Sequence, residues 1–163
     1  MLIVADTSPL NYLVLVEAVH ILPRLYGRIV IPPQVYLELQ QPDTPSVVRA
    51  WARVKPDWLE LRTPLSIDSS LPLDVGEAAA IALAGELKAD RLLIDERDGR
   101  QVARRLGIPI AGTLDVLKDG ATAGLVDLNT AFERLKKTTF RASPELFAQM
   151  LAEFQAGSRK MRP

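Results

Sequence analysis

Short apolar runs rich in β-branched residues alternate along this chain with segments of helical pattern. The runs lie at about residues 2–6, 28–31, 58–62, 91–95 and 108–111. Strands that alternate with helices in this way are typical of βαβ units, in which parallel strands are covered by helices. The pattern therefore predicts one α/β domain over residues 1–157 with a parallel sheet of about five strands, followed by a frayed basic tail at 158–163.

The helical segments can be placed from apolar periodicity and from proline and glycine positions. Ser8 and Pro9 have the residue types of a helix cap and first helical position, and Gly27 and Gly107 are expected to end helical units. The expected helices span about 9–17, 18–26, 34–41, 46–54, 74–87, 99–106, 113–123, 127–137 and 144–156. The last three are additional helices after the final strand.

Composition narrows the chemistry. The chain has 163 residues, of which 48% are hydrophobic, no cysteine and a single histidine, His20. Disulfides, cysteine nucleophiles and Cys/His zinc sites are excluded, and a Ser-His-Asp triad would have to use His20. Neither G-x-G spacing nor a phosphate-binding P-loop occurs. Any chemistry is expected to rest on oxygen ligands.

Charge and hydropathy indicate a soluble protein. Twenty basic residues balance twenty acidic ones, so net charge alone does not indicate a nucleic-acid partner. No apolar run approaches the roughly 18 residues of a membrane span, and no basic region precedes the first strand. We expect no membrane association and a cytoplasmic location.

Two of the predicted strands end in an aspartate. Ile3-Val4-Ala5 leads into Asp6, and Arg91-Leu92-Leu93-Ile94 leads into Asp95. The carboxyl ends of parallel strands meet at one edge of the sheet, where open α/β folds bind ligands. The two carboxylates are therefore candidates for chemistry.

Two further acids have comparable positions: Glu38 on the helix after the second strand, and Glu77 at the start of an alanine-rich helix. If the four carboxylates converge to about 5 Å, each ionised pair repels by about 3 kcal/mol at an effective dielectric constant of about 20. Such a group must share protons or hold a divalent cation, and oxygen ligands suit Mg²⁺ or Mn²⁺. Metal-assisted attack of water on a phosphodiester is the reaction class this arrangement favours.

Each acid also has a purely structural alternative. Asp6 could bond the amides of its turn, and Glu38 could be a solvated surface residue. Asp74 and Glu77 have the spacing of a capping box, which is the stronger interpretation for Glu77 alone. Asp95 could cap the following helix.

Two neighbouring residues are auxiliary candidates. Ser8 could bond Asp6 or a metal-bound water, or serve only as a helix cap. Asp98 fits a cap or a surface charge better than a ligand.

Several segments, in order, resemble the PIN-domain family, in particular its branch of uncharacterised proteins and candidate toxins of toxin–antitoxin pairs. The match spans about residues 2–155. Its segments are Ala5-Asp6-Thr7-Ser8-Pro9-Leu10, Ile31-Pro32-Pro33-Gln34-Val35-Tyr36-Leu37-Glu38, Asp74-Val75-Gly76-Glu77-Ala78, Leu93-Ile94-Asp95-Glu96-Arg97, Gly112-Thr113-Leu114 and Phe140-Arg141-Ala142-Ser143-Pro144-Glu145-Leu146.

The resemblance implies a three-layer α/β/α fold with a central parallel sheet and a Mg²⁺- or Mn²⁺-dependent ribonuclease site. The four acids of the family match Asp6, Glu38, Glu77 and Asp95, with Asp98 as an outer contributor. Many relatives have aspartate at the position of Glu77, so the longer side chain changes the ligand geometry there.

Basic residues near Asp95 offer modest support for RNA. Arg97, Arg100 and Arg104 are candidates for backbone contacts, and Arg100 and Arg104 share a helical face. A solvated basic helix explains them equally well. The last thirty residues hold seven Lys or Arg and two acids, which makes them a second, weaker candidate surface.

Apolar stripes raise the question of partners. Leu10, Leu13 and Val14, and then Val35, Tyr36 and Leu39, are expected to face the core. The alternative is a homodimer surface or a groove for a small antitoxin, as the resemblance implies.

The leading hypothesis is thus a metal-dependent endoribonuclease. One alternative is a catalytically inactive PIN-like module that binds RNA or protein. Another is a phosphatase of the haloacid dehalogenase type, which also begins with a strand-end aspartate. That family needs a second aspartate two positions later, where this chain has Ser8.

Overall fold

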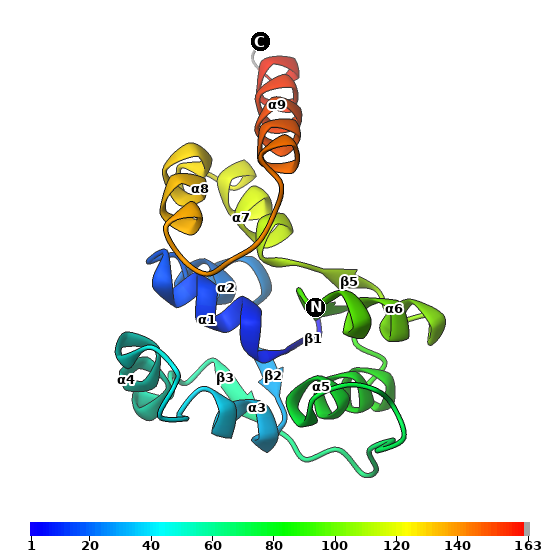
Figure 1. The fold of residues 1–163 in the computed structure, drawn as a ribbon. Coiled ribbons are helices and arrows are strands. Elements are labelled where there is room, and N and C mark those ends of the chain that lie inside the picture. The colour runs from blue at the N-terminus through cyan, green and yellow to red at the C-terminus, as the bar shows by residue number, and fades with distance from the viewer. Residues whose placement is uncertain (162–163) are drawn as a thin grey trace.

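A computed structural model describes residues 1–161 of the chain. Its centre is a five-stranded sheet in the order β3-β2-β1-β4-β5, and every neighbouring pair is parallel (Figure 1). The strands are β1 (Ile3–Ala5), β2 (Ile29–Ile31), β3 (Leu59–Leu61), β4 (Arg91–Leu93) and β5 (Ile110–Ala111). The predicted parallel sheet of five strands is confirmed.

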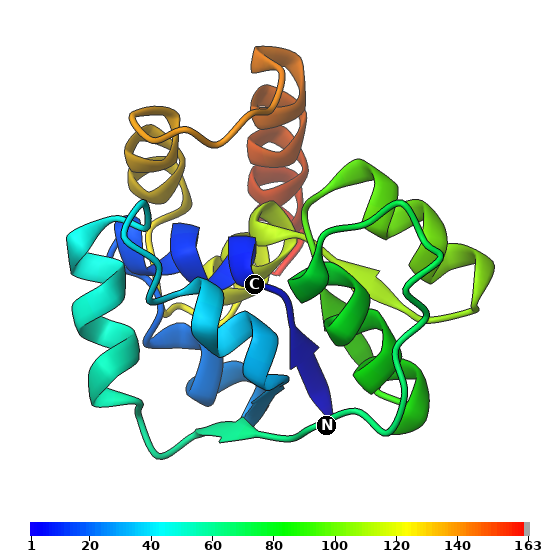
Figure 2. The same ribbon diagram turned by 60° about the horizontal axis from the view of Figure 1, so that its bottom comes forward.

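Helices flank the sheet on both sides, so the predicted three-layer α/β/α architecture is also confirmed. Figure 1 shows α1, α2 and α7 on one side and α5 on the other. Figure 2 shows α3 and α5 beside β1, where these helices pack against each other. The helices of the described chain are α1 (Thr7–Leu15), α2 (Ile21–Tyr26), α3 (Pro33–Glu38), α4 (Ser46–Val54), α5 (Val75–Glu86), α6 (Arg97–Arg105), α7 (Thr113–Thr122), α8 (Leu128–Lys136) and α9 (Pro144–Lys160).

Several helix ends differ from the expected ones; α2 begins at Ile21 rather than near residue 18, and α3 ends at Glu38 rather than near residue 41. Helix α1 begins at Thr7 with Asp6 at its N-cap position, so the predicted cap role of Ser8 is wrong. Helix α9 continues to Lys160, because no proline or left-handed glycine stops it near residue 156. The predicted tail at 158–160 is therefore helical, and residues 162–163 lie outside the described part.

The apolar stripes belong to the core. Leu10, Leu13 and Val14 on α1 are buried, as are Val35 and Leu39 in and after α3. Tyr36 is partly buried and packs against the same cluster. These residues join the buried strands in one hydrophobic core, which confirms the first interpretation of the stripes and removes them as candidates for an open partner surface.

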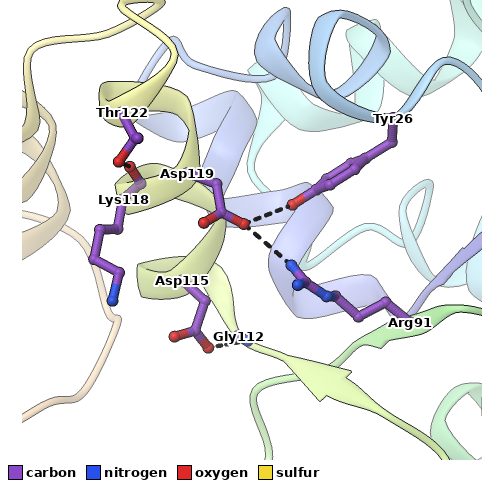
Figure 3. A network of polar contacts seen from close by, with 7 residues as sticks. All are labelled: Tyr26, Arg91, Gly112, Asp115, Lys118, Asp119 and Thr122. Carbon is purple, nitrogen blue, oxygen red and sulfur yellow. Dashed lines mark hydrogen bonds and ion pairs between the residues drawn. The ribbon is translucent and has the colours of Figure 1, made fainter. Parts of the chain in front are cut away.

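Asp119 on α7 lies in a polar network near the amino ends of the strands (Figure 3). Its Oδ2 accepts hydrogen bonds from the hydroxyl of Tyr26 at 3.3 Å and from Nη1 of Arg91 at 3.1 Å. Burial and the neighbouring Asp119 raise the pKa of Tyr26 to about 12, so the phenol stays protonated and donates. This network, which we call the Asp119 network, pairs its acid with a cation.

Within residues 1–161, none of the helices combines the length and the apolar character needed to cross a membrane.

Candidate active site

Asp6 lies at the carboxyl end of β1, the central strand, where the chain turns into α1. Its backbone N–H donates to the carbonyl of Leu93 at 2.9 Å, which ties the turn to β4. The side chain is only 2% exposed. It makes no capping hydrogen bond, and its Oδ1 has no hydrogen-bond partner in the described chain. The turn-bonding alternative for Asp6 therefore does not account for this oxygen.

The surroundings of Asp6 oppose ionisation. Burial is the main cause that raises its pKa, to about 8, and the nearby amide of Thr7 only partly offsets it. The charges of Asp74, Glu38 and Asp95 raise the pKa further. Asp6 is thus buried near three other acids, a costly arrangement unless a proton or a cation compensates the charge.

Glu38 is the last residue of α3 and is held at both carboxylate oxygens. Oε2 accepts a hydrogen bond from the hydroxyl of Thr7 at 2.5 Å, and Oε1 accepts one from the N–H of Gly76 at 3.0 Å. A Cβ atom at Gly76 would overlap the Glu38 carboxylate. Glycine therefore lets α5 approach the acid closely. Partial burial raises the pKa of Glu38, and the two hydrogen bonds oppose this shift.

Glu77 lies in the first turn of α5 and is 7% exposed. The capping-box interpretation is half confirmed, since Oδ1 of Asp74 accepts from the N–H of Glu77 at 2.8 Å. Among the described residues, the Glu77 side chain makes no reciprocal bond to the Asp74 backbone; its Oε2 lies instead near Gly99 of α6. Burial first, and then Asp74 and Asp6, raise the pKa of Glu77.

Asp95 follows β4 by two residues and is not the cap of α6, because Glu96 occupies that N-cap position. Both of its oxygens accept from Thr113 at the start of α7. The backbone N–H binds Oδ1 at 2.7 Å, and the hydroxyl binds Oδ2 at 2.7 Å. Burial raises the pKa of Asp95 and these bonds lower it. Asp95 is thus held in position by a neighbouring helix.

Asp74 is a member of this group that sequence reasoning treated only as a cap. Its charge contributes to the raised pKa values of Asp6, Glu38 and Glu77. The sequence could have indicated this, because Asp74 lies only three residues before Glu77. A residue that caps the helix carrying a site acid lies close to that acid. The hydrogen bonds from Thr7 and Thr113 to site carboxylates were also not foreseen.

The auxiliary candidates lie at the rim. Ser8 is in the first turn of α1, without a hydrogen bond to Asp6 in the described chain. Asp98 is exposed in the first turn of α6 and is not its cap. It lines a pocket of about 170 Å³, whose other lining residues are Pro72, Leu73, Asp74, Glu77, Glu96 and Arg97.

Helix α6 presents the arginine candidates. Arg97 and Arg104 are exposed, whereas Arg100 is partly buried and its Nη1 donates to the carbonyl of Ile94 at 2.8 Å. Arg100 is also close enough to Asp95 to lower the pKa of that acid. Of the three, Arg100 is the one placed beside the carboxylates.

The donor set suits a hard divalent cation. It contains only carboxylate oxygens, and one of them, Oδ1 of Asp6, is buried and unpartnered. No three acidic or histidine side chains in residues 1–161 are close enough to form a ready-made metal site. The carboxylates therefore fit Mg²⁺ or Mn²⁺ by chemistry, while the ligand distances would have to shorten on binding.

The PIN-domain family model matches residues 2–156 of the chain. No curated protein matches the sequence significantly. PIN domains are typically nucleases, act on RNA and generally use divalent metals, and the match gives no support to the phosphatase alternative. The parallel sheet, with acids at the carboxyl ends of its strands, agrees with a family match over nearly the whole chain. This protein therefore belongs to the PIN-domain family.

Proposed function

We propose that this protein is a metal-dependent endoribonuclease that hydrolyses RNA phosphodiester bonds at the group formed by Asp6, Glu38, Glu77 and Asp95. The observation that carries the proposal is the buried, unpartnered oxygen of Asp6 among other acids. Within the described chain, no lysine or arginine forms an ion pair with any of the four. A proton or a cation from solution must therefore balance the charge at Asp6, and the unpartnered oxygen is a ligand that a cation could take.

The four residues have different tasks in this proposal. Asp6 supplies the free central oxygen, and Glu77 supplies a second buried carboxylate next to it. Glu38 and Asp95 are oriented by Thr7, Gly76 and Thr113; the longer Glu77 reaches toward α6. When bound, Mg²⁺ or Mn²⁺ neutralises phosphate charge and lowers the pKa of water.

The role as a toxin with a small antitoxin partner, and the homodimer, stay predictions from the family resemblance. The stripes first considered for such partners are buried in the core of this chain. A partner surface would have to use other residues. Exposed apolar side chains near the site include Leu37, 59% exposed, and Val75, 68% exposed.

Cleavage of single-stranded RNA in the presence of Mg²⁺ or Mn²⁺ tests the enzymatic proposal. Asp6→Asn and Asp95→Asn should each reduce the rate by about a thousandfold, since a metal contributes several kcal/mol to transition-state stabilisation. Asp119→Asn replaces an acid near the amino ends of the strands, at the opposite end of the sheet from the site. This variant should cleave like the wild type. If both site variants cleave like the wild type, the proposal is wrong. RNA binding without cleavage by the wild type would favour the inactive module.

A further inference from the structure

A pocket of about 310 Å³ opens next to Asp95, on the side away from β1. Its lining residues come from α6, from the start of α7, and from α9 and the segment that precedes it. The volume is in the range of pockets that hold small organic ligands. Its polar and aromatic lining residues are Asp95, Arg100, Asp115, Phe140 and Arg141. We call it the Phe140 pocket.

Two guanidinium groups line the Phe140 pocket. Arg141 is exposed, and neither Arg100 nor Arg141 forms an ion pair in the part of the chain that is described. Arg100 uses Nη1 for the carbonyl of Ile94, which leaves most of its five N–H donors for another acceptor. Planar guanidinium donors of this kind suit a phosphate group.

An aromatic ring forms part of the wall. Phe140 is partly exposed and is fixed by edge contacts with Tyr12, at 5.1 Å between ring centroids, and with Phe147, at 6.5 Å. Leu114, Leu146 and Met150 continue the apolar surface. A fixed aromatic ring beside basic residues is the kind of surface on which nucleobases stack.

Three of the four carboxylate oxygens in the pocket lining accept hydrogen bonds from the chain. Both oxygens of Asp95 accept from Thr113, and Oδ2 of Asp115 accepts from the N–H of Gly112 at 2.8 Å (Figure 3). The second oxygen of Asp115 remains an acceptor for the N–H groups of a base. The pocket thus offers N–H donors for a phosphate, an apolar wall for a base and a carboxylate acceptor. This combination fits a nucleotide better than inorganic phosphate.

We propose that the Phe140 pocket binds one nucleotide of single-stranded RNA, with its phosphate at Arg100 and Arg141 and its base against Phe140. The proposal rests on the proposed nuclease function, because it places this nucleotide next to the phosphodiester that would be cleaved. It assigns substrate positioning to the segment between α8 and α9, which contributes none of the four carboxylates.

Fluorescence anisotropy of a labelled single-stranded RNA of about ten nucleotides, in EDTA to prevent cleavage, tests this binding. Phe140→Leu should weaken binding about tenfold through lost stacking. Arg141→Gln should weaken it about fivefold and lower the salt dependence by about one counterion. The matched controls are Phe147→Leu, in the same aromatic cluster but outside the pocket lining, and Arg53→Gln, an exposed arginine on α4.

Binding unaffected by both pocket variants, equal losses in the controls, or no binding by the wild type would overturn the proposal. These outcomes are independent of the cleavage assay. RNA binding that depends on Phe140 in a protein that never cleaves supports the pocket and refutes the nuclease. If cleavage depends on Asp6 while Phe140→Leu and Arg141→Gln leave RNA binding unchanged, the nuclease proposal is supported and the pocket proposal is refuted.

Discussion

Acids at the two ends of the sheet have opposite surroundings. At the amino edge, Asp119 accepts from Tyr26 and is paired with Arg91. At the carboxyl edge, Asp6 is more deeply buried, has an unpartnered oxygen and is surrounded by other acids. An arginine of the chain thus neutralises the carboxylate at the amino edge, whereas within the described residues no lysine or arginine forms an ion pair with Asp6 at the carboxyl edge.

This difference separates a structural role from a functional one. The Asp119 network satisfies its own charges and can stabilise the fold without a ligand. The carboxyl edge is destabilising by itself, since desolvation and like charges raise the pKa of Asp6 and of Glu77. Such uncompensated cost is expected where a cation binds.

The largest expected effect concerns Asp6 in the metal-free protein. Its folded-state pKa of about 8 lies above the ordinary value of 3.8. The folded state therefore retains a proton that the unfolded chain loses. The stability from this group is fully present below about pH 4 and falls by about 1.4 kcal/mol per pH unit until the pH passes about 8.

Asp6→Asn removes this titration and should stabilise the metal-free protein by on the order of 4 kcal/mol at pH 7. Urea unfolding in EDTA at several pH values, with wild type and variant compared, measures the difference. The gain should vanish near pH 4. A variant that is less stable than the wild type at pH 7 would mean that Asp6 has a structural role, like Asp119.

Gly76→Ala tests how closely α5 must approach Glu38. The added Cβ would displace the Glu38 carboxylate from Thr7 and from the Gly76 amide, at a cost of about 1–2 kcal/mol. The control on the same helix is Gly85→Ala, whose Cβ would meet only Ile108 at 3.9 Å. It should stabilise the protein by about 0.5–1 kcal/mol. Equal shifts in the melting temperature of the two variants would contradict the close contact between Gly76 and the Glu38 carboxylate.

The smallest effect is expected at the amino edge. Arg91→Met removes the cation beside Asp119 but leaves the bond from Tyr26. Because the side chains of Arg91 and Asp119 are 35% and 39% exposed, the loss should be about 1 kcal/mol. Thermal unfolding measures it. A change in RNA cleavage with this variant would show that the two edges are coupled.

Much of the fold followed from the sequence. The apolar runs and helical periods located all five strands. Two strand-end acids predicted the edge of the sheet that carries the candidate site, because the parallel arrangement brings strand ends together. Ser8 was misplaced as a cap because Asp6 itself takes that position, which local residue preferences could not distinguish.

The hydrogen bonds that orient the acids were harder to predict. Thr113 reaches Asp95 across 18 positions, and Gly76 reaches Glu38 across 38. Such contacts depend on how helices pack, and residue spacing does not encode them. Asp74 was recognised as a cap, yet its charge near Asp6 became visible only in three dimensions.

Calorimetric titration with Mn²⁺ at pH 7 tests most directly whether the carboxyl edge is a cation site. The wild type and Arg91→Met should bind with the same affinity and release protons on binding, because Asp6 must ionise. Asp6→Asn should show no binding at millimolar Mn²⁺. Binding by Asp6→Asn that equals the wild type, or no binding by a folded wild type, would contradict the account.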